Sequence, residues 1–271
     1  MCVPGCQEAV RSALSRRRLF KGGAALAVGL AAGLPANAQA AVGRFNSAVD
    51  LTHTMSPAFP TFFDEPGIEI QKQFDFRKDG LNLNWWRIME HAGTHLDAPI
   101  HFSESGASAD AFHVNDLVVP LAVVDVSAKA AQNPDYRLTP DDVLDWEGKH
   151  GRLPEQCCVA MHSGWARHVA DAKYLGRDAS DVRHFPGFDP SAAEWLMRQR
   201  RVIGLAVDTL SLDHGPSKDF KTHLAWLPSG RWGLENVANL DRVPASGATL
   251  VVGVAKVKDA TGGPARLIAL V

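Results

Sequence analysis

The sequence contains few cysteines for its length, and their placement argues against a disulfide framework. There are four among 271 residues, and two of them, Cys2 and Cys6, lie near the N-terminus. The other two, Cys157 and Cys158, are adjacent, and neighbouring cysteines rarely reach strain-free disulfide geometry. They stand in the apolar run 157–161, and free cysteine is among the most buried residue types. We therefore expect both to be buried strand residues in a protein that folds on its hydrophobic core.

Several motifs that mark hydrolases and nucleotide-binding enzymes are also missing. The sequence has no G-x-S-x-G nucleophile elbow, no H-E-x-x-H pair, no Walker loop and no G-x-G-x-x-G turn. A serine nucleophile of the elbow type and a phosphate-binding loop are therefore excluded. If the protein is a hydrolase, a metal-coordinated water remains as its nucleophile.

The first forty residues have the features of an export signal. The segment 15–21, Ser-Arg-Arg-Arg-Leu-Phe-Lys, resembles a twin-arginine signal, and residues 22–34 form a mildly apolar stretch too short to span a bilayer. An A-x-A cleavage site follows at 38–40. An anchoring N-terminal helix is the alternative, but an arginine run before small and apolar residues fits export better. We expect a periplasmic protein that begins at Ala41.

The chain without this signal has a mildly acidic composition. Residues 41–271 carry 23 basic and 29 acidic side chains, a formal charge of −6. This balance argues against nucleic acid or an anionic membrane as the partner. Some 230 residues can bury one substantial core, and no Ser/Gly/Pro-rich linker or internal repeat divides them. We therefore expect one domain over residues 41–271.

Short runs rich in valine, leucine and isoleucine predict the strands. They cover residues 117–126, 157–161, 202–207, 249–257 and 265–271, and the last two should pair across the turn 259–263. Two helices are indicated by their starts, because Thr139-Pro140 and Asp189-Pro190 each supply an N-cap followed by proline at the first helical position. Strands outnumber helices, so the predicted fold class is α/β, a single domain with a mixed sheet.

The segment 91–101, His-Ala-Gly-Thr-His-Leu-Asp-Ala-Pro-Ile-His, holds the greatest concentration of reactive side chains. Imidazole and carboxylate are preferred ligands of zinc and manganese, and His91, His95 and Asp97 supply them within seven residues. Pro99 rules out one helix through the segment, and Gly93 permits a sharp bend after His91. A bent loop can direct these ligands to one point, so clustering of this kind favours a metal site over scattered histidines.

The same segment resembles the H-x-G-T-H-x-D-x-P-x-H signature of the cyclase-like metal-dependent hydrolase family, of the kynurenine formamidase and isatin hydrolase type. All fixed positions of the signature are present. The resemblance extends over nearly all of residues 45–271, through the segments 50–57, 163–165, 211–215 and 234–240. It implies a swivelling β/β/α fold, a homodimer, and one or two divalent ions, Zn²⁺ or Mn²⁺, per chain.

The resemblance also implies where the remaining metal ligands lie. Family members carry a histidine and an acidic or amide residue twelve positions apart in the C-terminal half, and His223 and Glu235 have this spacing. In kynurenine formamidase-like members the pair helps to hold a second ion, bridged by the aspartate that matches Asp97. In isatin hydrolase-like members the acidic position is an amide and one manganese is bound. From the residues alone, the favoured interpretation of Glu235 is a carboxylate at a helix start, stabilised by the helix dipole; its spacing from His223 favours the ligand instead.

His101 lies beyond Pro99, and we expect it to act as the acid–base group rather than as a ligand. An imidazole near its unperturbed pKa of ~6.5 could take a proton and return it to a leaving nitrogen. The other histidines have no comparable spacing and are expected to be structural or on the surface. His53 and His214 stand in segments that resemble family segments near the site.

Aromatic residues near the segment 91–101, which we call the metal segment, suggest the kind of substrate. Phe59, Phe62 and Phe63 cluster before it, and Trp85 and Trp86 precede it directly. Aromatic walls beside a polar centre suit a flat aryl substrate, although ordinary core packing explains such residues equally well. We take Phe59, Phe62, Phe63 and Trp85 as candidate substrate-binding residues.

These features together predict a metal-dependent amidohydrolase that cleaves the C–N bond of an aryl formamide, such as N-formylkynurenine, or of a cyclic aryl amide, such as isatin. A non-catalytic periplasmic metal-binding protein is the competing class. A family member that acts on another ester or lactone is a third. A non-ligating His101 discriminates the first from the second, because a storage protein needs no acid–base group.

The export signal gives the first testable prediction. The intact mass of the exported protein should correspond to a chain that begins at Ala41. The double substitution Arg16→Lys and Arg17→Lys should leave the unprocessed precursor in the cytoplasm. A wild-type protein that retains Met1, or unimpaired export of the double variant, would contradict the signal.

Overall fold

The computed structural model describes residues 45–271. The predicted signal, residues 1–40, lies outside these residues. The strands are β1 (Ala48–Asp50), β2 (Ile68–Phe74), β3 (Leu83–Ile88), β4 (His95–Asp97), β5 (Val118–Asp125), β6 (Arg137–Leu138), β7 (Cys158–His162), β8 (Gly187–Phe188), β9 (Gly204–Val207), β10 (Trp232–Glu235), β11 (Ala248–Val254) and β12 (Gly262–Leu270). The helices are α2 (Phe76–Asp79), α3 (Ser127–Gln132), α4 (Pro140–His150), α5 (Pro190–Arg200) and α6 (Lys221–Trp226). Within the described residues no helix is long and apolar enough to cross a membrane.

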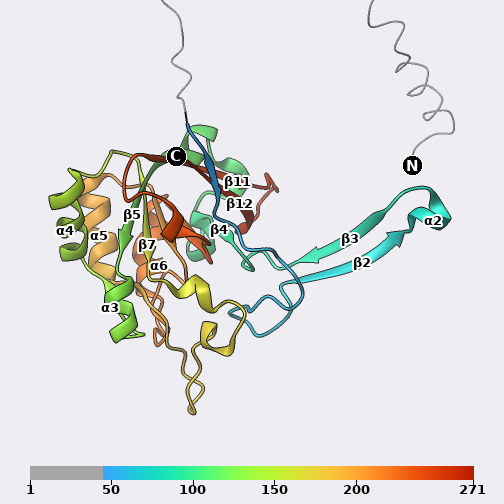
Figure 1. Ribbon diagram of the computed structural model, residues 1–271. Coiled ribbons are helices and arrows are strands. Elements are labelled where there is room, and N and C mark those ends of the chain that lie inside the picture. Colours follow the sequence, from blue (N-terminus) through green and yellow to red (C-terminus); the bar gives the residue numbers. More distant parts are fainter. Residues whose placement is uncertain (1–44) are drawn as a thin grey trace, which may run out of the picture. The chain divides into compact units, whose positions relative to one another are not determined.

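The main sheet closes on itself. Its order is β1-β12-β11-β5-β7-β9-β10-β4, and β4 pairs with β12 as well as with β10. The strands β5, β7, β9 and β10 run parallel to one another, whereas the remaining pairings are antiparallel. Figure 1 shows α4 and α5 beside β5 and β7. The predicted α/β class with a mixed sheet is confirmed, and closure of the sheet into a barrel is a feature that the sequence patterns did not predict.

Alternate residues of the strands pack into two separate cores. Leu121, Cys158 and Ala206 belong to a cluster to which all seven strands of the closed ring contribute, so this cluster fills the barrel. Their neighbours in sequence, such as Val159 and Leu205, join a second cluster with apolar residues of α4 and α5. The strands are therefore buried on both faces, which explains why they read as continuous apolar runs.

The helix starts agree with the sequence-based expectations, and the cysteines agree in part, because only Cys158 lies in a strand and Cys157 directly precedes it. Thr139 and Asp142 form a reciprocal capping box at the start of α4. The Asp189 side chain accepts a hydrogen bond from the backbone N–H of Ser191 at the start of α5. Cys157 and Cys158 are free and buried, and burial raises the pKa of the Cys157 thiol to about 12. These thiols are therefore structural.

The strands β2 and β3 form a separate two-stranded sheet that was not predicted. They project from the barrel as an antiparallel ribbon, which we call the arm and define as residues 68–88 (Figure 1). The arm includes Trp85 and Trp86, which the sequence placed only as neighbours of the metal segment. Both are 64% exposed.

The packing of β9 against β10 gives a prediction for stability. A Cβ atom on Gly204 would overlap the indole ring of the buried Trp232. Gly204→Ala should therefore destabilise the fold by about 1–3 kcal/mol, as overpacking of a core does. Gly148→Ala is the matched control, because its Cβ in helix α4 would meet open space and should stabilise the helix by roughly 0.5–1 kcal/mol. Thermal unfolding of both variants tests this, and an unchanged melting temperature for Gly204→Ala would contradict it.

Candidate metal centre

The short strand β4 places the metal segment between two other strands. Its register sets His95 opposite Glu235 and Asp97 opposite Gly233 on β10, and sets Asp97 opposite Gly262 on β12. Successive residues of a strand point to opposite faces. Leu96 therefore enters the barrel core, while His95 and Asp97 lie on the outer face together with Glu235. Strand pairing brings the three candidate ligands together, although His95 and Glu235 are 140 residues apart in the sequence.

Two glycines make room for the Asp97 carboxylate. A Cβ on Gly233 would lie 2.7 Å from the side chain of Leu212 and 3.4 Å from Oδ2 of Asp97. A Cβ on Gly262 would lie 2.7 Å from Cε1 of His91. Side chains at these positions would displace the groups that surround Asp97, so glycine on both neighbouring strands is a steric requirement of the site.

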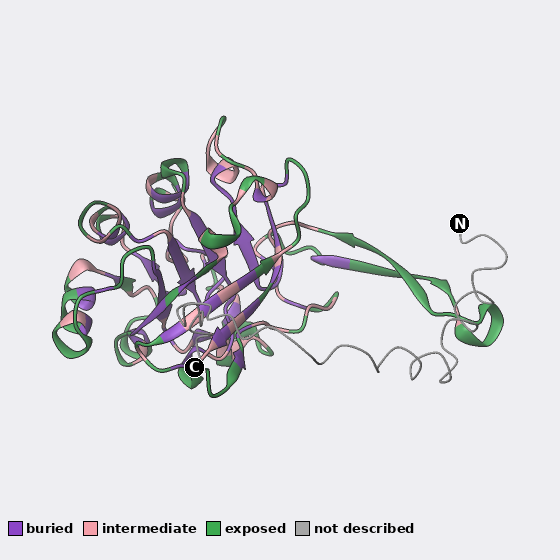
Figure 2. Cartoon of the chain, turned by 90° about the horizontal axis from the view of Figure 1, so that it is seen from above, coloured by how far each residue is buried: buried purple, intermediate pink, exposed green. Residues whose placement is uncertain are grey.

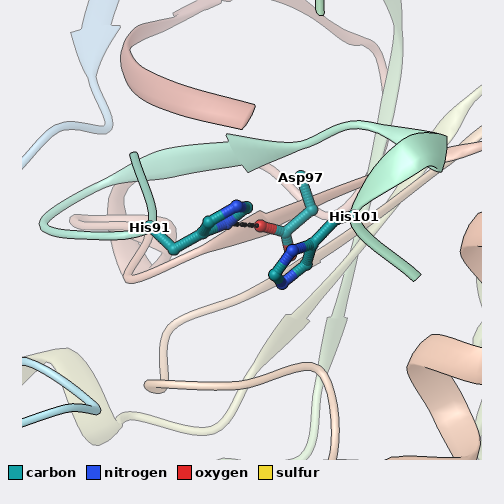
Figure 3. Close-up of side chains that lie close together, drawn as sticks. All are labelled: His91, Asp97 and His101. Atoms are coloured by element: carbon teal, nitrogen blue, oxygen red, sulfur yellow. Dashed lines mark hydrogen bonds and ion pairs between the residues drawn. The ribbon is translucent and has the colours of Figure 1, made fainter. Parts of the chain in front are cut away.

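His91 is held against Asp97 from the loop that precedes β4. Gly93 adopts a φ of +68°, the left-handed conformation that the expected bend after His91 requires. Nδ1 of His91 lies 2.6 Å from Oδ1 of Asp97, and its Nε2 lies 2.8 Å from Oγ1 of Thr261. Figure 3 shows His91 and His101 approaching the Asp97 carboxylate from neighbouring positions.

His223 reaches the same carboxylates from helix α6. Its Nε2 lies 3.0 Å from Oε1 of Glu235 and 3.6 Å from Oδ2 of Asp97. Its Nδ1 lies 2.6 Å from Oδ2 of Asp213. The same carboxylate accepts hydrogen bonds from two backbone N–H groups, that of Thr222 at Oδ1 and that of His223 at Oδ2. Asp213 therefore holds the start of α6 and orients the imidazole, as carboxylates behind ligating histidines do.

The charges in this cluster are strongly coupled. Burial alone would lower the pKa of His95, but the charges and hydrogen bonds of Asp97 and Glu235 outweigh burial and raise that pKa to about 10. For Asp97, burial acts to raise the pKa, and the surrounding histidines lower it well below its usual range. The pocket thus stabilises two ionised carboxylates, which favours positive charge among them.

The donor atoms fit a divalent cation. The ligand atoms of His95, Asp97 and Glu235 lie within 4.8 Å of one another, and so do those of His91, Asp97 and His101. Nε2 of His95 lies 3.2 Å from Asp97 and 3.4 Å from Glu235. Nevertheless, it makes no hydrogen bond within the described residues, nor does Oδ2 of Asp97. Buried polar atoms without partners are rare, and a bound cation accounts for both.

The structure brings all six predicted metal and catalytic residues into one cluster, but it groups them differently from the expectation. We expected His91, His95 and Asp97 around one ion, with Asp97, His223 and Glu235 around a second. In the structure, the ligand atoms that lie close together form two other sets. One set is His91, Asp97 and His101, and the other is His95, Asp97 and Glu235. Asp97 belongs to both groups, as a bridging carboxylate would. Glu235 ends strand β10, so its alternative interpretation as a helix-start carboxylate is wrong.

His101 is stacked on His91 and does not titrate in its ordinary range. It lies in a 3₁₀ turn at Pro99–Phe102, with the two imidazole centroids 3.7 Å apart. Burial lowers the pKa of His101 to about 4, although Asp97 acts to raise it. The expected pKa near 6.5 is therefore wrong, because the side chain is largely removed from water.

Phenylalanines form the wall of a cavity of about 260 Å³ that opens onto the cluster. Of the four candidate substrate-binding residues, Phe62 and Phe63 line it. Phe59 does not, because it is buried in a separate cluster with Trp165 and Tyr174. Trp85 does not line it either, because it lies on the exposed arm. Within one chain, therefore, Phe62 and Phe63 border this cavity, whereas Phe59 and Trp85 lie away from it.

Residues that the sequence did not single out complete the site. Phe102 and Phe220 line the cavity, and Phe102 stacks on His223 with ring centroids 4.7 Å apart. Asp213 and Thr261 orient His223 and His91. Of these four residues, only Asp213 could have been found from the sequence, because it belongs to the segment 211–215, which resembles a family segment.

His53 and His214, which stand in segments that resemble family segments near the site, do not line the cavity that opens onto the cluster. His53 lines a different cavity, of about 330 Å³, together with His162 and Asp208. His214 lines two other cavities, both with Arg137 and one of them with Asp189.

Comparisons with known proteins show which family and fold this chain resembles. The sequence profile described as "Putative cyclase" matches residues 49–214. Isatin hydrolase of Roseibium aggregatum is 32% identical over 241 residues, 82% of this chain and 91% of the relative. Kynurenine formamidase of Salinibacter ruber is 25% identical over 81% of this chain and 95% of the relative. The solved structure of isatin hydrolase A from Ralstonia solanacearum superimposes with a TM-score of 0.78 at 34% identity, covering 83% of this chain and 92% of that one.

The position of Glu235 predicts the number of metal ions. Glu235→Gln keeps the shape of the side chain and removes one of the two carboxylate charges of the cluster, those of Asp97 and Glu235. It should reduce the metal content from about two ions per chain to about one while the fold is preserved. Elemental analysis and circular dichroism of both proteins provide the test. A wild type that already saturates with one ion would contradict the two-ion centre.

Proposed function

The chain belongs to the putative cyclase family, and we propose that it is a metal-dependent amidohydrolase that cleaves the C–N bond of a small aryl amide. The observation that carries this proposal is that the candidate metal ligands lie next to an aromatic cavity. A buried cluster of histidines and carboxylates, with donor atoms that lack partners within the described residues, opens into a cavity walled by phenylalanine.

Five residues would hold the metal: His91, His95, Asp97, His223 and Glu235. When bound, Zn²⁺ or Mn²⁺ supplies Lewis acidity and lowers the pKa of a coordinated water toward neutrality. The protein contributes the geometry. Asp213 and Thr261 fix the orientation of His223 and His91, and Gly93 accepts a hydrogen bond from Nδ1 of His95 through its carbonyl oxygen at 2.9 Å.

His101 is placed to move the proton. It borders the cavity and contacts the cluster through His91. With its pKa lowered to about 4 by burial, the imidazole is neutral at neutral pH and can accept a proton from the attacking water. It can then donate that proton to the leaving nitrogen, which otherwise departs as an unstable anion.

The cavity favours a small, flat substrate. Its volume of about 260 Å³ lies slightly below the range of roughly 300–1,000 Å³ typical of ligand pockets. Phe62, Phe102 and Phe220 present ring faces and edges to an aryl group. Their arrangement around the polar cluster would place an amide carbonyl near the metal ligands and the aromatic ring against the phenylalanines.

We propose two candidate substrate classes, and each is favoured by a different observation. A cyclic aryl amide such as isatin is favoured by the greater identity to isatin hydrolase, 32% against 25% for kynurenine formamidase. An aryl formamide such as N-formylkynurenine is favoured by Glu235, whose carboxylate suits a second cation. We also propose that the enzyme works in the periplasm, which is supported by the arginine run at 16–18 and the A-x-A site at 38–40.

Hydrolysis assays with the purified, metal-loaded protein test the proposed reaction. Isatin should be opened to isatinate, or N-formylkynurenine converted to kynurenine and formate, with turnover abolished by a chelator and restored by Mn²⁺ or Zn²⁺. Tight metal binding without hydrolysis of either amide would favour the metal-binding protein. Hydrolysis of esters or lactones alone would place the chain among family members with other substrates.

Substitution of His101 separates proton transfer from metal binding. His101→Ala should leave the metal content and melting temperature close to wild type, and should lower kcat by roughly 10²–10⁴. His95→Ala is the comparison, because it should lose metal and activity together. Because His101 also offers an atom near His91 and Asp97, loss of metal from His101→Ala would identify it as a ligand. Full turnover with metal retained would refute the acid–base assignment.

A further inference from the structure

The carboxylate of Glu90 is not among the candidate ligands, although Glu90 directly precedes His91 in the sequence. Glu90 lies two residues after the arm, where the chain returns to the barrel. Figure 2 shows the arm itself as an exposed ribbon, whereas Glu90 is half-buried. Its side chain contacts Thr261, which is 171 residues further along the chain and directly precedes β12. This contact links the start of the metal segment to the strand that pairs with β4.

Thr261 is held by hydrogen bonds on three sides. Its hydroxyl donates to Oε2 of Glu90 at 2.5 Å, and its backbone N–H donates to the same oxygen at 3.3 Å. Its carbonyl oxygen accepts from the backbone N–H of Ala98 in the metal segment. The hydroxyl oxygen also lies 2.8 Å from Nε2 of His91. Glu90, Thr261 and His91 therefore form a chain of hydrogen bonds that ends at the metal centre.

The direction of these hydrogen bonds determines where the protons lie. A carboxylate only accepts hydrogen bonds, so the single hydroxyl proton of Thr261 points to Glu90. The hydroxyl oxygen then accepts a hydrogen bond from His91, and Nε2 of His91 must carry the donated proton. A neutral imidazole has one such proton, which leaves a free lone pair on Nδ1. That nitrogen lies 2.6 Å from Oδ1 of Asp97 (Figure 3), an arrangement that favours a cation in contact with both atoms.

His91 differs from the other two histidines around Asp97 in the atom that it offers to a metal. Nδ1 of His95 is bonded to the carbonyl oxygen of Gly93, and Nδ1 of His223 is bonded to Asp213. Each of these two histidines therefore offers Nε2. His91 offers Nδ1 instead, because its Nε2 is engaged by the Thr261 hydroxyl.

We propose that Glu90 is a positioning residue of the metal centre: through the Thr261 hydroxyl it holds His91 in the tautomer that presents Nδ1 to the metal ion. This inference rests on the proposed metal-dependent function. Without Glu90, the hydroxyl of Thr261 is free to turn and donate its proton to Nε2 of His91. The proton of the neutral imidazole then lies on Nδ1, and a metal ion must displace it in order to bind. Glu90 therefore favours metal binding without contacting the metal.

A purely structural role for Glu90 is the alternative. Because Oε2 of Glu90 also accepts the backbone N–H of Thr261, the residue might serve only to fasten the start of β12. The two roles differ in which group of Thr261 matters. Orientation of His91 requires the hydroxyl, whereas a fastener acts through the backbone as well and is kept when the hydroxyl is removed. Variants of Glu90 and Thr261 therefore separate the two roles.

Competition with a chelator of known affinity, added to the Mn²⁺-loaded or the Zn²⁺-loaded protein, tests the proposal. Glu90→Ala should raise the Kd for the metal by roughly 10–100-fold, as loss of the group behind a ligating histidine typically does. Its circular dichroism spectrum should remain that of the wild type. Glu104→Ala is the matched control, because it removes an exposed carboxylate three residues after His101 and should leave the Kd unchanged.

Variants of Thr261 provide a second, independent test. Thr261→Val removes the hydroxyl but keeps the shape of the side chain and the backbone N–H, and it should weaken metal binding about as much as Glu90→Ala does. Thr261→Ser returns the hydroxyl and should restore most of the affinity. The double variant Glu90→Ala and Thr261→Val should bind metal no more weakly than Thr261→Val alone, because Glu90 acts through the hydroxyl.

The possible failures of the proposal and of the proposed function are distinguishable, because the chelator assay needs no substrate. An unchanged Kd for Glu90→Ala or for Thr261→Val, in a wild type that binds metal tightly, would overturn the positioning role and leave the metal centre intact. Losses of affinity that add in the double variant would also overturn it. A wild type that retains neither ion would overturn the metal centre and this proposal together.

Discussion

The buried carboxylate of Asp97 is the constraint on which the rest of this structure depends. Its side chain is 1% exposed, and an ionised carboxylate removed from water is costly unless it is paired. His91, His95 and His223 surround it at 2.6, 3.2 and 3.6 Å, and each comes from a different element of the chain. Asp213 and Thr261 in turn hold two of these imidazoles. The cluster is therefore a network in which each group is placed by the one behind it.

The barrel places this network on the outer face of strands β4 and β10, which the helices leave uncovered. On β5, β7 and β9 the outer face of the sheet is covered by helices, whereas on β4 and β10 it carries the candidate ligands. Glycine opposite Asp97 on both neighbouring strands leaves space that side chains occupy elsewhere. Strand pairing thus holds the backbone of the cluster in place, and the phenylalanine-lined cavity leaves one side of the cluster open. A rigid base with one open side is the arrangement that metal-dependent hydrolysis requires.

Local patterns in the sequence predicted the chemistry better than the architecture. The eleven-residue segment 91–101 contains four of the six candidate residues, so their proximity followed from spacing alone. His223 and Glu235 were placed by resemblance, because nothing local links a helix residue and a strand end to a loop more than 120 residues away. Barrel closure depends on β4 pairing with both β10 and β12, and such long-range register leaves no signal in a three-residue strand. Trp85 lies away from the cavity of its own chain, because adjacency in sequence to the segment 91–101 does not set proximity in space.

Anomalous X-ray diffraction from crystals of the metal-loaded protein tests the central claim most directly. Data collected at the absorption edges of manganese and zinc locate each ion and identify it. The account predicts density in contact with Oδ2 of Asp97 and Nε2 of His95, the two buried atoms that lack hydrogen-bond partners within the described residues. Density confined to other places, or none at Asp97 in a protein that hydrolyses its substrate, would contradict it.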